Sequence, residues 1–584
     1  MVVPPNKCAW FVALSLCASW AGDLFAQNRP LERAERERKK ILGDDSFRQG
    51  EDSVIDQRDN EPAGDSSPLG VNFVSIELIS HQDKATISAE PSGEGVVIDP
   101  RLPAPAGVNA ALKPYLGREV SMALLGELGK DIVMAWRESD YPLVDVYFPE
   151  QNITQGRIQV VVREAVLGNR NVTGAVLTKE DYILHQFRLK AGDRVNSRRV
   201  EADLDWLNEN PVREIRVVYE KGEKDGTTNL GLEVEERKQV TSYSGFANTG
   251  LNSTGENEFS FGFNIGNPLG LEHAFGYNFG ADEDFNFLQA HSVFYQAFLP
   301  WRHTLRFIGA HVSSEARNQG GLGVKGLSEQ VTTAYRIPLR RPEFNRSWKH
   351  YFTLAFDYKS TDTDLIFGGD NLFTTELQVG QFRGSYEFGV PDSHGFTRVT
   401  LGVVGSPGGI FGDNEDNNFM MARSGSTSDY WYTFGEFERS ISLPRDFLFR
   451  VRASGKATTH RLASTEQILG GGYATVRGFD ESIIRGDSGF LGTAELVSPP
   501  LDLFESLDDT VRFFAFIDTA AFDITNPLPG ESSPALTGAG LGVTCRLGDS
   551  GFARASYGWA LSDYGISPSQ VDQGKFHFGL SVTY

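Results

Sequence analysis

The chain has 584 residues, with 55 basic and 77 acidic side chains, so its formal charge is −22. A pI near 5.0 argues against binding to a nucleic-acid backbone, which needs a concentrated basic surface. After residue 26 no apolar run approaches the roughly 20 residues of a membrane-spanning helix, so a helical membrane protein is excluded. A transmembrane β-barrel stays possible, because its strands alternate lipid-facing and polar residues.

The N-terminal segment predicts export from the cytoplasm. Residues 1–26 combine a basic start with an apolar run and small residues, as in a signal peptide, and we expect cleavage after Ala21 or Ala26. Residues 27–70 are expected to contain a short charged helix at 30–42 and then a flexible linker rich in Asp, Ser and Pro. This helix is interpreted as either a movable plug of a pore or a disordered leader.

A first small α/β unit is expected over residues 71–167. Strands are expected at 71–80, 143–148 and 157–162. Residues 81–110 are expected to form an insertion, with a possible extra strand at 96–98. One helix carries apolar residues at every fourth position, which predicts a buried stripe; these residues are Val120, Leu124, Leu128, Ile132 and Trp136.

A second unit of similar order is expected over residues 168–238. A strand at 169–172 precedes helical segments that begin near 178 and 197. Two further strands are expected at 214–219 and 229–235. The two units therefore look like tandem copies, each with one sheet covered by helices.

From residue 239 to residue 584 the pattern is that of β-strands. In residues 259–266 apolar side chains alternate strictly with small or polar ones, and about sixteen such segments fit the remaining length. We expect a sixteen-stranded antiparallel transmembrane barrel with a polar lumen, because an open sheet edge in lipid would leave peptide groups unpaired. A soluble β-sandwich or propeller is the alternative.

Aromatic residues support the membrane interpretation. They make up 11% of the chain, and those near the predicted strand ends are expected at the membrane interface. The residues expected there are Trp301, Trp348, Tyr430, Trp431 and Tyr432. Alternate residues of the last strand are expected to form the C-terminal signal for the barrel-assembly machinery; they are Phe578, Leu580, Val582 and Tyr584.

Residues 140–168 resemble the first POTRA module of two-partner secretion (type Vb) outer-membrane transporters, the haemolysin-activator, ShlB-like branch of the Omp85 superfamily. The second unit is similar to this family at 204–211 and 226–230, and residues 248–255 are similar to its first barrel hairpin. The POTRA motif residues are Pro149, Glu150, Gln151 and Gly156.

The strongest match is the sequence Val476-Arg477-Gly478-Phe479. The resemblance implies a long loop between the eleventh and twelfth strands that folds into the lumen. An arginine in a water-filled lumen favours a carboxylate on the wall, and Gly478 lets the backbone pass close to it. Partial exposure to water would limit such a pair to about 1–3 kcal/mol and leave it breakable.

The resemblance also implies the partner of Arg477. It is the aspartate of a Phe-x-Asp-x-Gly strand, which corresponds here to Asp518 between Phe516 and Ala520. Ala520 replaces the family's glycine, which weakens the expectation of a close backbone approach at that position. The alternative interpretation is that the pair only fastens the loop and that no functional change breaks it.

No residues in the sequence indicate catalysis. The histidines are scattered, and neither a nucleophile elbow nor a phosphate-binding loop is found. Gly538-Ala-Gly540-Leu-Gly542 lies in an alternating strand without a following helix, so these glycines are interpreted as barrel-wall positions. Cys545 is the one cysteine outside the signal segment, which excludes a disulfide framework. We expect no enzyme, no metal and no cofactor.

The resemblance implies an outer-membrane pore that recognises a haemolysin- or adhesin-like exoprotein in unfolded, extended form and secretes it from periplasm to cell surface. The POTRA modules would lie in the periplasm. The other expected partners are outer-membrane lipid and the barrel-assembly machinery; no nucleic acid is expected, and the transporter should be a monomer. The alternatives are an Omp85-type factor that assembles other barrels and a passive diffusion porin.

Overall fold

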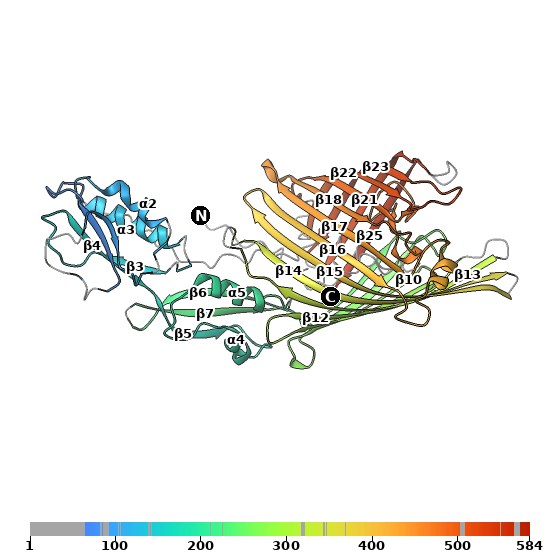
Figure 1. Ribbon diagram of the computed structural model, residues 1–584, viewed down its shortest axis with the longest axis horizontal. Coiled ribbons are helices and arrows are strands. Elements are labelled where there is room, and N and C mark those ends of the chain that lie inside the picture. The colour runs from blue at the N-terminus through green and yellow to red at the C-terminus, as the bar shows by residue number, and fades with distance from the viewer. Residues whose placement is uncertain are drawn as a thin grey trace. The chain divides into compact units, whose positions relative to one another are not determined.

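The computed structural model describes most of the chain after residue 64 (Figure 1). The predicted signal peptide and the helix and most of the linker predicted over 27–70 lie outside the described residues. The two α/β modules together form one compact unit, and the barrel forms another. The described ranges are 65–81, 85, 93–102, 104–105, 107–137, 140–141, 143–210, 212–224, 226–316, 322–342, 345, 347–367, 370–502, 509–548, 550–565 and 573–584.

The first module has a four-stranded sheet in the order β2-β1-β4-β3. Four of the five residues of the predicted apolar stripe lie on α3, whereas Val120 precedes the helix and is also buried. Leu128, Ile132 and Trp136 of the stripe are fully buried against the sheet. The extra strand within the predicted insertion is β2, which pairs in parallel with β1. The elements are β1 (Ser75–Ile79), β2 (Gly95–Ile98), α2 (Val108–Leu112), η3 (Lys113–Tyr115), α3 (Met122–Arg137), β3 (Val144–Tyr147) and β4 (Arg157–Glu164).

The second module has a three-stranded sheet in the order β5-β7-β6. This order matches β1-β4-β3 of the first module, so the two modules repeat one strand arrangement. Leu230 and Leu232 of β7 pack against Ile183 and Leu207 of the two helices. The elements are β5 (Val166–Thr173), α4 (Glu180–Gln186), α5 (Ser197–Leu207), β6 (Arg213–Lys221) and β7 (Thr227–Glu236).

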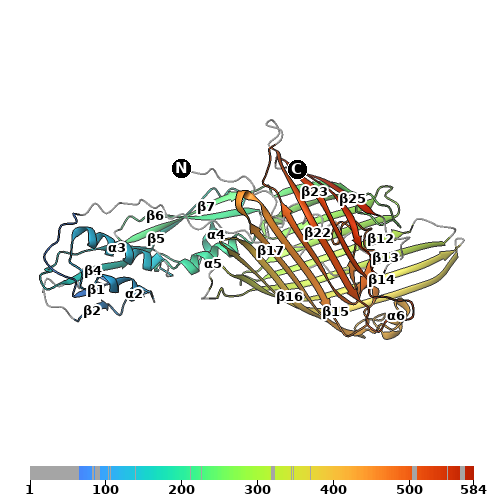
Figure 2. The ribbon, with the colours of Figure 1, turned by 90° about the horizontal axis from the view of Figure 1, so that it is seen from above.

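Sixteen strands of the described chain close into one antiparallel barrel, as predicted, and neighbouring strands run side by side (Figure 2). The strands are β8 (Val240–Ala247), β9 (Glu258–Gly266), β10 (Ala274–Asp282), β11 (Leu288–Phe298), β12 (Thr304–Glu315), β13 (Leu322–Pro338), β14 (Lys349–Phe367), β15 (Asp370–Asp392), β16 (Gly395–Pro407), β17 (Asp429–Ser442), β18 (Leu448–Ala457), β21 (Ser488–Val497), β22 (Asp509–Asp523), β23 (Ala535–Leu547), β24 (Gly551–Ser562) and β25 (Gly574–Thr583).

The barrel closes where the last strand, β25, pairs with the first, β8. The register joins Gly579 to Ala247 and Thr583 to Tyr243. Beyond this register the side chain of Asn248 extends the pairing, since its Nδ2 donates to the carbonyl of Phe576 at 2.8 Å and its Oδ1 accepts from the backbone N–H of Phe578 at 2.7 Å. A side chain therefore replaces strand backbone at this point of the closure.

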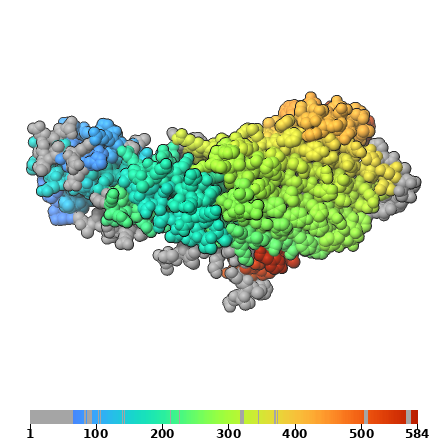
Figure 3. All heavy atoms as spheres, turned by 90° about the horizontal axis from the view of Figure 1, so that it is seen from below, coloured from blue at the N-terminus to red at the C-terminus, as the bar shows by residue number. Residues whose placement is uncertain are grey.

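Side chains alternate between an apolar outer face and a polar lumen. On β22 Phe513 and Ile517 are exposed on the outside, whereas Asp518 is buried inside. Buried polar groups such as Gln330 and Thr332 line the interior of β13. Figure 3 shows one face of the molecule, where the atoms coloured green and yellow, which belong to the barrel, form a continuous surface. Among the described residues, no helix combines the length and apolarity of a membrane span.

The prediction that Tyr430, Trp431 and Tyr432 all lie at the membrane interface was wrong for the two tyrosines. Trp431 is half exposed on the outside, whereas Tyr430 and Tyr432 are fully buried inside the barrel. Consecutive residues of a strand point to opposite faces, so three in a row cannot all meet lipid. The Tyr430 hydroxyl donates to Gln381 at 2.7 Å, and the Tyr432 hydroxyl donates to Glu466 at 3.1 Å.

Candidate functional site

The candidate site is the segment 458–487, called here the lumenal loop. It connects β18 and β21, the eleventh and twelfth strands of the barrel, which confirms its predicted place in the strand order. Two short strands, β19 (Ile468–Gly470) and β20 (Ile484–Gly486), pair with each other and form a hairpin within it. Apolar residues of the loop pack against the inner faces of β22 and β23; the buried members of this cluster are Val476, Phe479, Ile484, Ala520, Phe522 and Leu536.

Arg477 is held by three hydrogen bonds to Asp518 on β22. Its Nε donates to Oδ2 at 2.6 Å, its Nη2 to Oδ1 at 2.8 Å, and its backbone N–H to Oδ2 at 3.1 Å. Both side chains are buried, so the contact is drier than the partly exposed pair that the sequence predicted. Fork-on-fork geometry fixes both the distance and the angle of the guanidinium.

A second carboxylate, Glu495 on β21, completes the site. Nη1 of Arg477 donates to its Oε1 at 2.6 Å, and Arg554 of β24 donates to the same oxygen at 3.1 Å. The guanidinium carbon of Arg477 lies 3.5 Å from the ring centroid of Phe516. Burial opposes the charge of Arg477, but Asp518 and Glu495 outweigh burial and raise the pKa of its guanidinium.

Neither Glu495 nor Arg554 was predicted from the sequence as part of this site. Strand alternation does place both side chains inside the barrel, since Leu496, next to Glu495, is exposed on the outside. Alternation alone does not say which part of the lumenal loop meets which wall position.

The backbone of Arg477 and Gly478 rests on two wall glycines, Gly538 of β23 and Gly558 of β24, called here the glycine seat. A Cβ on Gly538 would lie 2.0 Å from the carbonyl oxygen of Arg477. A Cβ on Gly558 would lie 2.5 Å from the backbone nitrogen of Gly478. Gly478 itself has φ +101°, which disfavours any side chain there. The close approach therefore requires glycine on both sides.

Ala520 does not prevent the close approach, because the approach occurs elsewhere. Its methyl group is fully buried and packs in the cluster that includes Val476 and Phe479. The loop meets β23 and β24 at the glycine seat, so the alanine at 520 fills a small apolar gap on β22.

The POTRA motif residues lie in the turn before β4. The side-chain amide of Gln151 pairs with Gln159 of β4, donating to its carbonyl at 2.8 Å and accepting from its N–H at 2.6 Å. Gly156 has φ +75°, and a Cβ there would lie 2.1 Å from the carbonyl oxygen of Asn72. Pro149 is buried and Glu150 is exposed. Gln151 and Gly156 thus hold the turn against β1 and β4.

Gly156→Val is expected to destabilise the first module. A β-branched side chain in the left-handed region is strained, and here it would also collide with backbone, so we expect a loss of about 2–4 kcal/mol. Limited proteolysis of the purified full chain should then cleave within residues 71–167 at a protease concentration that leaves the parent chain intact. Gly117→Val, also at positive φ but with no atom within 4 Å of the added Cβ, separates strain from collision.

The four residues predicted to form the C-terminal signal lie on the last strand, β25, or directly after it. Leu580 and Tyr584 are exposed on the outer face. Phe578 packs against Phe246 of β8, with ring centroids 5.6 Å apart. The inward neighbour His577 is fully buried. Phe578, Leu580 and Val582 therefore share the lipid-facing side of the strand that closes the barrel.

Among the described residues, no group of three His, Cys, Asp or Glu side chains is placed to hold a metal ion. The buried charged groups of the site bind one another and hold the lumenal loop against the wall.

Comparison with known proteins identifies the family. A family model described as haemolysin secretion/activation protein ShlB/FhaC/HecB matches residues 226–545, and a model described as POTRA domain, ShlB-type, matches residues 101–165. The chain belongs to the ShlB/FhaC/HecB family. Both modules and the barrel therefore form part of an outer-membrane transporter of the two-partner secretion type, as the resemblance predicted.

Relatives of this transporter include CdiB-2 of Burkholderia pseudomallei, 23% identical over 66% of each chain. The heme/hemopexin transporter protein HuxB of Haemophilus influenzae is 22% identical over 65% of this chain and 67% of its own. The alignments thus span about two thirds of the length of these relatives. The solved structure of CdiB from Escherichia coli has a TM-score of 0.72 at 18% identity and covers 96% of this chain and 99% of its own, which supports the same fold.

Family membership fixes the orientation of the barrel. The transporter lies in the outer membrane with its POTRA modules in the periplasm. Since β8 follows the periplasmic modules, it crosses the membrane outward. When the barrel strands are counted in chain order with β8 as the first, every connection after a strand of odd rank lies at the outer end. The lumenal loop, which follows the eleventh strand, therefore enters the lumen from the cell surface.

Proposed function

We propose that this transporter secretes an exoprotein, in unfolded and extended form, through the barrel lumen from periplasm to cell surface. The observation that carries the proposal is a lumenal loop fastened to the wall by a compact buried contact at Arg477. Such a loop closes a pore when it is docked and opens it when it leaves as one body. The lumen wall offers polar groups to a passing peptide backbone.

Entry would begin at a sheet edge of a POTRA module. In the second module β6 is an outer strand of its sheet and has nine residues, whereas β3 of the first module has four. Main-chain pairing at such an edge recognises an extended chain with little demand on its sequence. In the first module the extra strand β2 pairs with β1 and covers its edge. Of the two edge strands β3 and β6, β6 offers the longer backbone for pairing.

Lipid on the outer face and the barrel-assembly machinery during biogenesis are the other proposed partners, and the transporter would act as a monomer without catalysis or nucleic acid. The extended form of the cargo is proposed from the mode of entry, because main-chain pairing at a sheet edge requires an extended chain.

Deleting the gene is expected to remove one large protein from the culture medium while the other outer-membrane proteins stay at normal levels. Comparison of the secretomes and the outer-membrane fractions of the parent and deletion strains would measure both, with the plasmid-borne gene as control. A broad decrease in other barrels, with envelope stress, would instead indicate an assembly factor. An unchanged medium would contradict secretion.

A further inference from the structure

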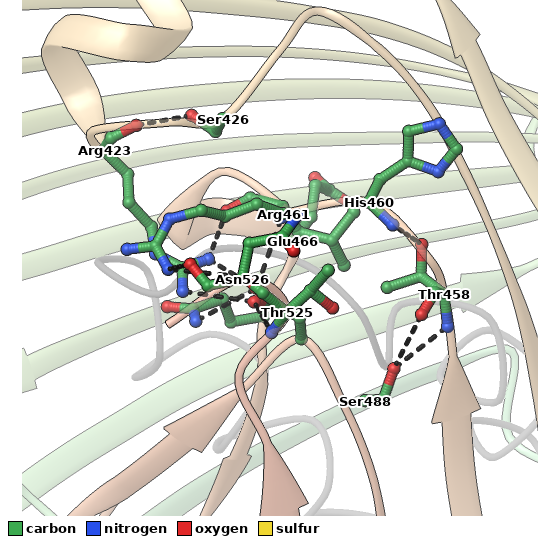
Figure 4. Close-up of polar contacts among 12 residues, drawn as sticks. Arg423, Ser426, Thr458, His460, Arg461, Glu466, Ser488, Thr525 and Asn526 are labelled. Atoms are coloured by element: carbon green, nitrogen blue, oxygen red, sulfur yellow. Dashed lines mark hydrogen bonds and ion pairs between the residues drawn. The ribbon is translucent and has the colours of Figure 1, made fainter. Parts of the chain in front are cut away.

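Three segments meet at the outer end of the barrel, away from Arg477. They are the loop 408–428 between β16 and β17, the loop 524–534 between β22 and β23, and the two ends of the lumenal loop (Figure 4). In chain order they follow the ninth, eleventh and thirteenth barrel strands, which are β16, β18 and β22. All three connections therefore lie at the cell-surface end of the barrel.

Asp487, the last residue of the lumenal loop, connects it to both neighbouring loops. Its carboxylate is fully buried and accepts two hydrogen bonds from Arg423 of the loop 408–428, one of them at 3.2 Å. It also accepts from the backbone N–H of Thr525 in the loop 524–534 at 2.9 Å. Within the lumenal loop, the N–H of Leu462 donates to it at 3.2 Å.

Arg461, near the first end of the lumenal loop, also binds both surface loops, but as a donor. Its guanidinium pairs with both oxygens of Glu531 in the loop 524–534, at 2.6 and 2.8 Å. Its Nε donates to the carbonyl of Ser424 in the loop 408–428 at 2.7 Å. The lumenal loop thus supplies a carboxylate at one end and a guanidinium at the other, and each binds both surface loops.

We propose that Arg461 and Asp487, with Arg423 and Glu531, form an outer clasp that closes the cell-surface mouth of the pore and positions the lumenal loop, separately from the contact at Arg477. The inference rests on the proposed function and deepens it, because it adds a second closure that the exported chain must open. Arg461 and Asp487 act as positioning residues, since they hold the ends of the loop that carries Arg477.

The clasp and the Arg477 contact use different parts of the barrel. Arg477 binds side chains on β21 and β22 and rests on β23 and β24, whereas the side chains of Arg461 and Asp487 bind residues of the two surface loops and of the lumenal loop itself. Releasing one does not require releasing the other. The two closures can therefore open in sequence as a chain moves from the periplasmic end towards the surface.

Mild acidification leaves the Arg461–Glu531 pair of the clasp intact. The hydrogen bonds from Arg461 lower the pKa of Glu531 to about 2. A carboxyl with a lowered pKa keeps its pairing above its ordinary value and loses it only as the pH falls towards the lowered one. At neutral pH Arg461 and Glu531 therefore both stay charged and paired.

The test compares Glu531→Gln with Glu315→Gln in the purified full chain. Glu531 is partly exposed, so its variant should fold, and heat-modifiable gel mobility checks the barrel. Glu315 is the matched control, because it pairs with Lys325 at 3.0 Å at the outer end of β12 and β13. In planar bilayers we expect the open probability of Glu531→Gln to rise about tenfold, as for loss of one charge-assisted hydrogen-bonded pair, and that of Glu315→Gln to stay unchanged.

Charge reversal supplies the second arm. Arg461→Glu is expected to raise the open probability as Glu531→Gln does, and Arg461→Glu combined with Glu531→Arg is expected to return it towards the parent value. A cysteine introduced by Thr475→Cys, in a Cys545→Ser background, should react faster with polyethylene-glycol maleimide added to intact cells when the clasp is broken. This reagent is too large to cross the outer membrane.

Equal open probability and equal labelling in the parent, Glu531→Gln and Arg461→Glu chains would overturn the clasp, as would a double reversal that stays as open as the single variants. Neither readout depends on the exported partner. A strain that secretes nothing but responds to Glu531→Gln would therefore contradict the proposed function and keep the clasp, and normal secretion with no response would do the opposite.

Discussion

Arg477→Ala is expected to abolish secretion while leaving the barrel assembled. The substitution removes the partner of two buried carboxylates, Asp518 and Glu495, together with the ring contact at Phe516. Removing one partner of a buried ion pair costs about 3–5 kcal/mol, so the docked position of the loop loses about two to four orders of magnitude in population. A loop that no longer docks fills the lumen in many conformations and cannot leave as one body.

The measurement is the amount of exported partner in the medium relative to the amount of heat-modifiable barrel in the outer membrane. Arg477→Lys should fail as Arg477→Ala does, because an ammonium group cannot bind both oxygens of Asp518 and Glu495 together. Arg439→Ala is the matched control, since Arg439 pairs with Asp392 near the short connection between β15 and β16, at the periplasmic end. Normal secretion by the Arg477→Ala strain would mean that the contact only fastens the loop.

Much of the architecture could be predicted because it follows from periodicity. The four-residue spacing from Val120 to Trp136 identified the buried face of α3, and the two-residue alternation gave both the number of barrel strands and the position of the lumenal loop. The same alternation would have placed Tyr430 and Tyr432 inside the barrel, had it been applied to three aromatic residues in a row.

The pairings within the lumen could not be predicted from a pattern. Asp518 was expected as the partner of Arg477 only through the resemblance, and the hydrogen bonds that Glu495, Glu531 and Asp487 accept depend on how the long loop folds back across the wall. An inward-facing charge on a strand can meet any group that the loop brings to it. Sequence spacing fixes the face of each residue but not its partner across the lumen.

Substitution at the glycine seat is expected to have the second large effect on secretion. Gly538→Ala is expected to reduce secretion to the level of the Arg477→Ala strain, although it changes none of the charged groups. A Cβ 2.0 Å from the carbonyl oxygen of Arg477 must displace the loop backbone or the wall. The Arg477 guanidinium binds both oxygens of Asp518 through hydrogen bonds of 2.6 and 2.8 Å. A shift of about 1 Å breaks this geometry.

Gly558→Ala should act in the same way from the neighbouring strand, because its Cβ would lie 2.5 Å from the backbone nitrogen of Gly478. Gly280→Ala is the matched control: Gly280 shares the inner face of β10 with Asn278 and Asp282, and the nearest atoms to an added Cβ are 3.9 Å away. Secretion and heat-modifiable mobility would be measured for all three variants. If Gly538→Ala secreted as well as Gly280→Ala, the loop would not need close contact with the wall, and the charged contacts alone would set its position.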